Sequence, residues 1–532
     1  AAGGGKAARE GTSGGGGGST PKAATSGHHR TNSKGRNNSN SGGGGAPAPK
    51  AMVKRRATAK PRQLSVEEMM EVEVRNYGDV EDYYRITEVV LGQGNFGKVR
   101  LAVANAGGAI RAIKTVPQEL ARSKATGVFK QEVYVMKMID HPNLVMLHEI
   151  FEDSDDLHLV IELCMGGHLL DRIRMTRRLV ERDAALVMQQ ILRGITYLHS
   201  RRIAHRDLKA ENCLVTSRSY ITEGRIKVGD FGLSRIFKPG EVWKARVGTP
   251  THWAPEVLER NYTQCCDLWA CGVIMYHAIT GRLPYSEAND CEQVRKHRPV
   301  DLASEDWQKL HSEAPDLGKQ LLEFDPGQRP TAAKASRHAW LRHFSEKQPD
   351  APFKRRHLLN LQEFRSFRPM QRAALEAVTT QLGDREVSAS RKLWLGLDTN
   401  GDGLLTIEEL RRKLSRCRNA DVRKLAMTPI FLESERRALG KRAVLKPFTY
   451  TEFVSATCAR RYCGDIPIGQ AAFRSFDKNG DGLITPDDLA ISGFFIGSSI
   501  EDLTEVIKQV HSRKEESIDL EEFQSLLSGL TD

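Results

Sequence analysis

A series of short motifs between residues 92 and 256 constrains the fold more than any other feature of the sequence. In chain order they are Gly92-Gln93-Gly94-Asn95-Phe96-Gly97-Lys98-Val99, Ala112-Ile113-Lys114, His205-Arg206-Asp207-Leu208-Lys209-Ala210-Glu211-Asn212, Asp230-Phe231-Gly232 and Ala254-Pro255-Glu256. The first motif follows a short apolar run, and its spacing fits a hairpin better than the strand-to-helix turn of a dinucleotide site. The sequence therefore predicts a hairpin whose glycine-rich turn can approach phosphate groups with its backbone.

The polar residues of these motifs match the requirements of phosphoryl transfer. That reaction needs a carboxylate to accept a hydroxyl proton, oxygen ligands for Mg²⁺, and cations near the migrating charge. The candidates for these three roles are, in order, Asp207, the pair Asn212 and Asp230, and the pair Lys209 and Lys114. Glu132 lies in a segment with apolar residues at helical spacing and is a candidate partner for Lys114. A single lysine–glutamate pair is more often an ordinary surface pair, so the interpretation depends on the whole ordered set.

Residues 83–341 resemble a eukaryotic protein kinase domain on these motifs. The resemblance extends to the core helix Asp267-Leu268-Trp269-Ala270-Cys271-Gly272, and to Arg329, which would pair with Glu256. It implies a bilobal α+β fold that binds ATP and Mg²⁺. Lys209 and the segment Gly248-Thr249-Pro250 resemble serine/threonine kinases rather than tyrosine kinases. The resemblance implies nucleotide contacts from Leu91, Gly92, Gly94, Phe96, Gly97, Val99, Ala112, Lys114, Glu162, Cys164 and Leu214. A pseudokinase is the alternative, although every catalytic position is filled.

Two departures within the kinase-like region bear on control and specificity. In many relatives Arg206 would receive an activation-loop phosphate, yet residues 235–247 contain no Ser, Thr or Tyr. Control by phosphorylation of this loop is therefore disfavoured. Glu211 lies where related kinases place a carboxylate against a substrate arginine, whereas His168 replaces the usual glutamate nearby. A protonated His168 would repel arginine, which weakens the expected preference for it upstream of the acceptor.

Two acidic loops about 80 residues apart form an internal repeat near the end of the chain. Residues 398–409 and 477–488 fit the 12-residue EF-hand calcium loop, with a glycine at position 6. The candidate ligands are Asp398, Asn400, Asp402, Leu404 and Glu409 in the first loop, and Asp477, Asn479, Asp481, Leu483 and Asp488 in the second. Asp488 is one methylene shorter than the usual glutamate, so the second loop is expected to bind Ca²⁺ more weakly or to hold Mg²⁺. An acidic surface turn is the alternative for each loop.

Each loop should have a partner, and residues 441–452 and 511–522 keep only the helix-starting half of an EF-hand. With them, residues 83–532 resemble the calcium-dependent protein kinases of plants and protists, which join a kinase, a junction and a calmodulin-like domain. The resemblance assigns 344–388 to the junction and 389–532 to an all-α EF-hand domain. Leu375, Val378 and Leu382 form an apolar stripe in the junction. In the family this segment blocks the kinase without Ca²⁺, and the EF-hands grip it when Ca²⁺ is bound. Open alternatives are a solvated basic linker, EF-hands with a purely structural role, and a non-enzymatic calcium-binding scaffold.

The formal charge of +12 belongs almost wholly to the first 64 residues. They contain 12 basic residues, one acidic residue, 15 of the 46 glycines and no aromatic residue, so we expect this tail to be disordered. The rest of the chain is nearly neutral, so no dedicated nucleic-acid site is expected, although the tail by itself could bind nucleic acid. No apolar window is long enough to span a bilayer, and the nine cysteines lack metal-site spacing. We expect a cytoplasmic protein that acts on protein substrates, with nuclear or membrane-associated pools possible.

Overall fold

The computed structural model describes residues 76–77, 79–94, 97–119, 126–219, 221, 224–285, 294, 296–345, 353–415, 446–495, 497–510 and 516–531. The predicted disordered tail and Phe96 lie outside these residues, as do most ligand positions of the two incomplete EF-hand loops. Residues 60–532 form one unit by their contacts, and the description below concerns that unit alone.

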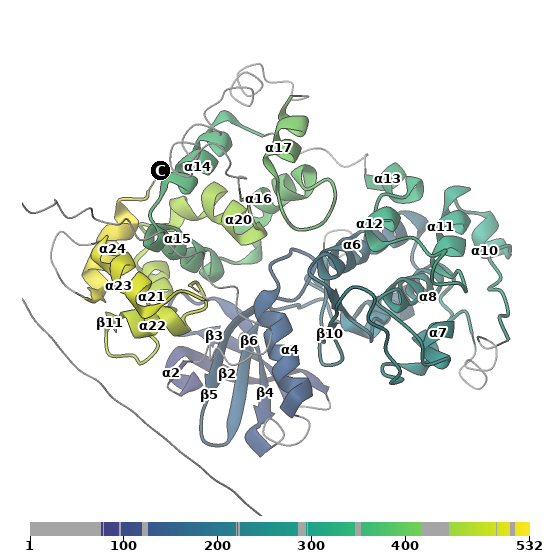
Figure 1. The fold of residues 1–532 in the computed structure, drawn as a ribbon, viewed down its shortest axis with the longest axis horizontal. Helices are drawn as coiled ribbons and strands as arrows, with labels where there is room; N and C mark the ends of the chain where they lie inside the picture. The colour runs from purple at the N-terminus through teal and green to yellow at the C-terminus, as the bar shows by residue number, and fades with distance from the viewer. Residues whose placement is uncertain are drawn as a thin grey trace, which may run out of the picture. The chain divides into compact units, whose positions relative to one another are not determined.

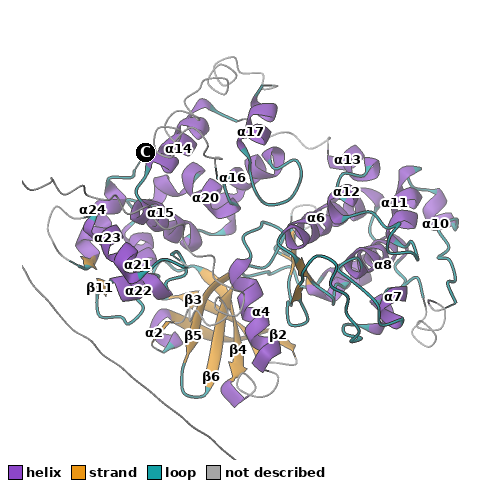
Figure 2. Cartoon of the chain, viewed as in Figure 1, coloured by secondary structure: helices purple, strands orange, loops and turns teal. Residues whose placement is uncertain are grey.

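The first part of the unit is a six-stranded sheet with one long helix against it (Figure 1; Figure 2). The sheet order is β1-β5-β6-β4-β3-β2, with β1 parallel to β5 and every other neighbouring pair antiparallel. The elements are β1 (Asn76–Tyr77), α2 (Val80–Tyr83), β2 (Tyr84–Gly94), β3 (Gly97–Ala104), β4 (Ile110–Pro117), α4 (Thr126–Met138), β5 (Leu147–Glu152) and β6 (Asp156–Ile161). Phe129 and Val135 of α4 share a buried core with Val116 of β4 and Leu159 of β6. The predicted glycine-rich hairpin is confirmed, since Gly92 pairs with Val99 and Gly94 with Gly97.

The second part is mainly helical and is built around α6 and α8. Its elements are α5 (Leu169–Thr176), α6 (Glu181–Ser200), β7 (Ile203–Ala204), η1 (Ala210–Asn212), β8 (Cys213–Val215), β9 (Ile226–Val228), β10 (Arg235–Ile236), η2 (Pro250–His252), α7 (Pro255–Leu258), α8 (Cys266–Thr280), α10 (Glu305–Gln308), α11 (Glu313–Leu321), α12 (Ala332–Ala335) and α13 (Ala339–Ser345). Almost every residue of α8 is buried, and the helix ends at Gly281, whose positive φ of 72° suits glycine. The predicted Arg329–Glu256 pair is confirmed by two hydrogen bonds of 2.6 and 2.8 Å.

The C-terminal part contains helices and one short two-stranded sheet. The elements are α14 (Arg355–Ser366), α15 (Pro369–Gln381), α16 (Asp384–Leu397), α17 (Ile407–Leu414), α20 (Tyr450–Thr457), η3 (Ala459–Tyr462), α21 (Ile466–Arg474), β11 (Leu483–Ile484), α22 (Pro486–Ile491), α23 (Ile500–Lys508), β12 (Ile518–Asp519) and α24 (Leu520–Ser528). Leu405 exchanges backbone hydrogen bonds of 2.9 and 3.0 Å with Phe448, and Ile484 of β11 pairs with Ile518 of β12. Each acidic loop is thus paired with a residue of the segment, 441–452 or 511–522, that the sequence suggested as its partner.

The predicted apolar stripe of the junction lies in the core of this helical part. Leu375 and Val378 of α15 are fully buried, and Leu382 is nearly so, in one cluster with Trp394 and Phe453. α15 packs against α20 and α21, and α14 packs against α20. This burial contradicts the alternative of a solvated linker for the described part of the segment. Among the described residues, no helix is long and apolar enough to cross a membrane.

Candidate active site and calcium loops

The candidate nucleotide-binding residues lie in and around the connection between the six-stranded sheet and the helical second part. Val99 of β3 pairs with Lys114 of β4, and Ala112 pairs with Ile161 at the end of β6. Glu162 and Cys164 follow Ile161 directly, and Leu214 lies in β8. Leu91, Gly92 and Gly94 lie on β2, and Gly97 begins β3. A Cβ atom at Gly97 would lie 1.8 Å from the carbonyl oxygen of Thr115, so only glycine fits this close approach.

Lys114 and Glu132 form the ion pair that the sequence suggested. The Nζ atom of Lys114 lies 2.6 Å from Oε1 of Glu132, which projects from α4. Glu132 is only 2% exposed, whereas Lys114 keeps 17% of its side chain accessible. Because breaking a buried pair leaves an uncompensated charge, the pair stabilises the position of α4 relative to β4. The ammonium group of Lys114 is thereby held in one place on the sheet.

Three side chains contact Asp207, two from its own motif and one from the segment around Thr249. Thr249 donates a hydrogen bond of 2.7 Å to Oδ1, and Nζ of Lys209 lies 3.0 Å from Oδ2. Asn212 donates hydrogen bonds of 2.8 Å to the backbone carbonyl of Asp207 and 3.3 Å to its Oδ2. The carboxylate is therefore held in one orientation and stays ready to accept a further hydrogen bond.

Thr249 is a site residue that the sequence reasoning missed as a contact. Its hydroxyl both donates to Asp207 and accepts a hydrogen bond of 2.8 Å from Lys209. The triplet Gly248-Thr249-Pro250 indicated the kinase class, and that signal could have pointed to Thr249 as a site residue. Gly248 allows the contact because a Cβ atom there would lie 2.4 Å from the carbonyl oxygen of Arg206, and its φ is +89°.

Asp230 and Asn212 are brought together by the backbone. The amide of Gly229 donates a hydrogen bond of 2.9 Å to the carbonyl of Asn212. Asp230 has a φ of 60° and an exposed side chain. The next residue, Phe231, is buried against His205, with the two ring centroids 5.5 Å apart. The two residues thus lie on neighbouring backbone segments, and a carboxylate open to water and an amide oxygen are ligand types that suit a hydrated Mg²⁺ ion that also binds phosphate.

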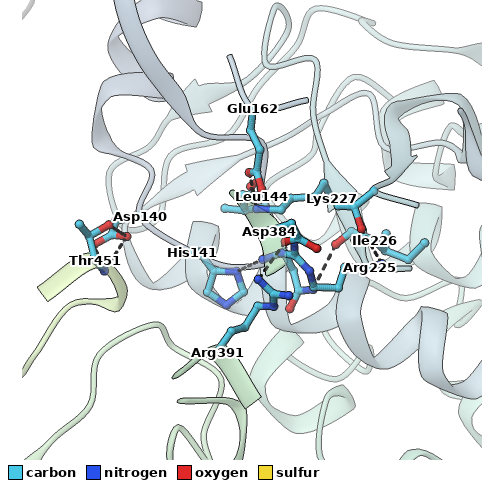
Figure 3. A network of polar contacts seen from close by, with 12 residues as sticks. Asp140, His141, Leu144, Glu162, Arg225, Ile226, Lys227, Asp384, Arg391 and Thr451 are labelled. Atoms are coloured by element: carbon cyan, nitrogen blue, oxygen red, sulfur yellow. Dashed lines mark hydrogen bonds and ion pairs between the residues drawn. The ribbon is translucent and has the colours of Figure 1, made fainter. Parts of the chain in front are cut away.

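The side chain of Glu162 is engaged in an ion pair with Lys227. Lys227, which is 1% exposed, donates to Oε2 of Glu162 and also donates 3.2 Å to the carbonyl of Leu144 (Figure 3). Burial lowers the pKa of Lys227 to about 8, although Glu162 opposes the shift. Since Lys227 occupies this carboxylate, a nucleotide contact from Glu162 would have to come from its main chain.

The C-terminal part contacts Arg225, close to Lys227 in the chain, through α16. Asp384, at the start of α16, pairs with Arg225 and accepts a hydrogen bond of 3.0 Å from Arg391 (Figure 3). Arg225 lies two residues before Lys227, and its charge is among those that lower the pKa of Glu162 against the opposing effect of burial. One continuous set of charges thus joins α16 to the residue that follows β6.

His168 and Glu211 lie next to each other at the start of α5. The Nδ1 atom of His168 lies within hydrogen-bonding distance of the backbone carbonyl of Glu211, and His168 is the N-cap residue of α5. The imidazole therefore contacts the main chain of the residue that carries the predicted arginine-binding carboxylate.

The first acidic loop has the backbone path of a calcium loop. Oδ1 of Asp398 accepts a hydrogen bond of 2.7 Å from the amide of Gly401, and Oδ2 accepts one of 3.3 Å from Gly403. Both glycines have a positive φ, 71° and 75°. Asn400 and Asp402 accept amide hydrogen bonds from Asp402 and Leu404, both of 2.9 Å.

The electrostatics of this loop suit a cation. Asp398 and Glu409 are almost fully buried, and Glu409 is held by the amide and hydroxyl of Thr406 at 3.2 and 2.9 Å. Burial raises the pKa of Asp398 to about 7, and Asp402 and Glu409 contribute, while Arg193 opposes the shift. Buried carboxylates of this kind are stabilised by a bound divalent cation.

The second acidic loop repeats this arrangement. Asp477 accepts hydrogen bonds of 2.8 and 3.1 Å from the amides of Gly480 and Gly482. Asn479 accepts a hydrogen bond from the amide of Asp481, and Asp481 accepts one from the amide of Leu483. Asp488 is buried and accepts hydrogen bonds of 3.0 Å from the amide of Thr485 and 3.2 Å from that of Lys478. The loop fits a cation. At its twelfth position it differs from the first loop, because Asp488 is one methylene shorter than Glu409.

A two-lobed fold with this ordered site, followed by paired acidic loops, defines a protein kinase that carries EF-hands. Comparison with protein families agrees, since the model of the protein kinase domain matches residues 85–341 and that of the EF hand matches residues 397–415 and 470–490.

The similarity to known proteins covers both the kinase-domain region and the EF-hand region of the chain. Calcium-dependent protein kinase 5 of Plasmodium falciparum is 31% identical over 470 residues, 87% of this chain and 81% of the relative. Calcium-dependent protein kinase 34 of Arabidopsis thaliana is 32% identical over 455 residues, 84% of this chain and 85% of the relative. Calcium-dependent protein kinase 15 of Oryza sativa is 33% identical over 449 residues, 82% of this chain and 80% of the relative. The chain belongs to the calcium-dependent protein kinase family, and it is a calcium-regulated serine/threonine protein kinase.

Proposed function

We propose that Asp207 is the group that orients the Ser or Thr hydroxyl of a protein substrate and accepts its proton. The substrate oxygen then forms a bond to the γ-phosphorus of ATP as the bond to the leaving ADP oxygen breaks. The observation that carries this proposal is the fixed carboxylate of Asp207, held by Thr249 and Lys209 with its neighbour Asn212.

The remaining candidates have positioning and charge-stabilising roles in the same proposal. Lys114, held by Glu132, binds the nucleotide phosphates, and Lys209 offsets the charge that develops on the transferred group. Asn212 and Asp230 would hold Mg²⁺, which supplies charge neutralisation when bound. Leu91, Val99, Ala112 and Leu214 would line the adenine site, and the main chain at Glu162 and Cys164 would bind its edge.

Replacing Asp207 by Asn tests the catalytic proposal. The amide keeps the shape of the side chain but accepts a proton poorly, so we expect kcat to fall by at least about a hundredfold with little change in the KM for ATP. The matched control is Glu259→Gln, an exposed acidic residue of the same lobe, which should leave kcat unchanged. Wild-type turnover by Asp207→Asn would exclude the proposed role.

We infer a division into a kinase domain at 83–341, a junction at 344–388 and a calmodulin-like domain at 389–532. In this proposal the junction occupies the substrate side of the kinase without Ca²⁺, and the EF-hands hold it when Ca²⁺ is bound. The burial of Leu375 and Val378 among the EF-hand helices supports the held arrangement. Withdrawing Ca²⁺ would weaken that core and free the apolar stripe for another surface.

A second set of contacts supports coupling between the EF-hands and the kinase. Asp384 of α16 pairs with Arg225 behind Glu162, and Arg193 of α6 lies beside Asp398 of the first calcium loop. Arg193 also donates a hydrogen bond of 3.5 Å to the carbonyl of Leu395. Because these contacts join a calcium loop to α6, binding of Ca²⁺ and docking on the kinase should influence each other.

A kinase assay over a calcium titration tests the regulatory proposal. Activity on myelin basic protein should rise with free Ca²⁺ and fall to a low level in excess chelator. Unchanged turnover in chelator would rule out calcium-dependent release of the junction. The test is independent of the catalytic proposal, since Asp207→Asn should be inactive at every calcium concentration.

A further inference from the structure

Arg206 precedes Asp207 and is held by groups other than a phosphate. Its backbone amide donates a hydrogen bond of 2.9 Å to Asp267 of α8, and its Nε donates one of 2.8 Å to the carbonyl of Leu233. Its guanidinium group lies over the ring of Trp243, 5.3 Å from the ring centroid. Arg206 has a φ of 64°, so these contacts maintain a backbone conformation that an arginine rarely adopts.

Trp243 lies in the middle of the loop that joins β10 to α7 and is firmly packed. It is 4% exposed, and the edges or faces of Phe237 and Tyr262 contact it at centroid distances of 6.2 and 5.5 Å. Its backbone exchanges hydrogen bonds of 2.8 and 3.2 Å with Tyr262, and the Tyr262 hydroxyl donates 2.6 Å to the carbonyl of Ala245. The indole is therefore held in one orientation beneath Arg206.

An acidic residue of the loop does not take the place of a phosphate on Arg206. Glu241 pairs with Arg235 at 2.7 Å and accepts hydrogen bonds of 3.0 Å from Nε1 of Trp243 and from the amide of Lys238. The Lys238 amide helps to lower the pKa of the Glu241 carboxyl. Arg235 itself also lies over the Trp243 ring, at 5.9 Å. Glu241 thus neutralises Arg235 and orients the indole.

Kinase loops with such an arginine are ordered by new contacts between arginine and a phosphorylated residue. Residues 235–247 provide no hydroxyl for phosphorylation. An aromatic face attracts a guanidinium group, most strongly when water is excluded, as it is around Trp243. The indole can therefore supply the attraction that a phosphate supplies elsewhere.

We propose that Trp243 is a positioning residue that replaces the activation-loop phosphate, holding Arg206 and through it the orientation of Asp207. This inference rests on the proposed role of Asp207. Arg206 is bonded to Asp207 in the chain, and its carbonyl lies against Gly248, next to the Thr249 that donates to Asp207. A displaced Arg206 would therefore move both the catalytic carboxylate and its hydrogen-bond donor.

Two substitutions of Trp243 separate the aromatic face from simple burial. Trp243→Leu keeps an apolar side chain but removes the π surface, whereas Trp243→Phe keeps it. At saturating Ca²⁺, with myelin basic protein as substrate, we expect kcat to fall about tenfold or more in Trp243→Leu, with the KM for ATP unchanged. Trp243→Phe should keep most of the wild-type kcat. Equal kcat values for the two variants would overturn the proposal.

A double-mutant cycle tests whether Trp243 acts through Arg206. Arg206→Ala should lower kcat by itself and should cause little further loss in the Trp243→Leu background, because the shared interaction is already absent. Additive losses would overturn the proposal. Calcium binding by each full-length variant checks that the rest of the chain is intact, and Trp243→Phe covers the case in which Trp243→Leu fails to fold.

Dephosphorylation of the wild-type protein provides a second readout. After treatment with a Ser/Thr phosphatase, verified by mass spectrometry, kcat should stay within about twofold of the untreated value. A large loss would mean that a phosphate is required, and the proposal would fail. If Asp207→Asn were active, the proposed function would fail; if it were inactive while Trp243→Leu kept full kcat, only the present inference would fail.

Discussion

The carboxylate of Asp140 accepts hydrogen bonds from Thr451, in the first turn of α20. The Thr451 hydroxyl donates a hydrogen bond of 2.7 Å to Oδ1, and the Thr451 amide lies 3.1 Å from both carboxylate oxygens (Figure 3). Asp140 follows α4 of the kinase, and α20 is the helix that the incomplete loop at 441–452 retains. The positive end of a helix favours a carboxylate, so this EF-hand remnant contacts the kinase with its helix.

Asp140→Asn should weaken this contact without changing its shape. The substitution removes the charge that the helix N-terminus and the Thr451 hydroxyl favour. Because docking and calcium binding are coupled in our proposal, we expect the calcium concentration for half-maximal activity to rise by about threefold to tenfold. Asp155→Asn, at an exposed position of the same lobe, serves as the control. Identical calcium curves for both variants would show that the Asp140 contact does not contribute.

Glu376 predicts how the stability of this region depends on pH. Burial, together with the charges of Glu452 and Asp140, raises its pKa to about 8, while Lys446 and Arg372 oppose the shift. The folded pKa is above the unfolded value, so the folded state retains the proton and its stability declines as pH rises through about 8. The melting temperature should therefore be lower near pH 9 than near pH 6, by a few degrees.

Glu376→Gln isolates this contribution. The neutral amide cannot ionise, so the melting temperature of the variant should fall less between about pH 6 and pH 9 than that of the wild type. Glu501→Gln, at an exposed position of α23, should behave like the wild type. An equal decline in Glu376→Gln and wild type would mean that other groups cause the pH dependence.

Thr249→Val should lower turnover by about tenfold to a hundredfold with a nearly unchanged KM for ATP. The substitution removes the hydroxyl that donates to Asp207 and accepts from Lys209, while keeping the side-chain volume. Thr249→Ser should restore most activity because it keeps the hydroxyl. Steady-state kinetics of these variants and of Thr251→Val as a control would decide the matter. Wild-type kcat in Thr249→Val would show that Asp207 does not need this donor.

The two calcium loops should respond differently to changes at their last position. Glu409→Gln should abolish one binding event in calorimetric titration of the full chain, since the neutral amide is a weaker ligand. Asp488→Glu should strengthen binding at the second loop by about tenfold, because the longer side chain can bind bidentately. Asp487→Glu, the exposed neighbour, is the control and should have no effect. If Asp488→Glu bound no more tightly than wild type, side-chain length would not limit this site.

Sequence reasoning predicted the backbone well where it depends on residues close together in the chain, as in the glycine-rich hairpin and both acidic loops. These elements and the motif that contains Asp207 are local patterns, because a turn, a strand or a loop imposes its spacing directly on the sequence. The Arg329–Glu256 pair was predicted across 73 residues only because the kinase resemblance supplied it. Thr249 was missed as a contact of Asp207 because 42 residues separate them.

The sequence by itself determined the chemistry of this protein: a phosphoryl-transfer site, two calcium loops and an apolar junction stripe. Only the tertiary structure decided which groups hold those elements in place. Trp243 lies under Arg206, Lys227 occupies Glu162, and Thr451 meets Asp140 across 311 residues. A motif specifies its own backbone and reactive groups through local geometry. Its distant partners are specified by packing, in which many weak contacts over the whole fold select one neighbour, and no spacing in the sequence records that choice.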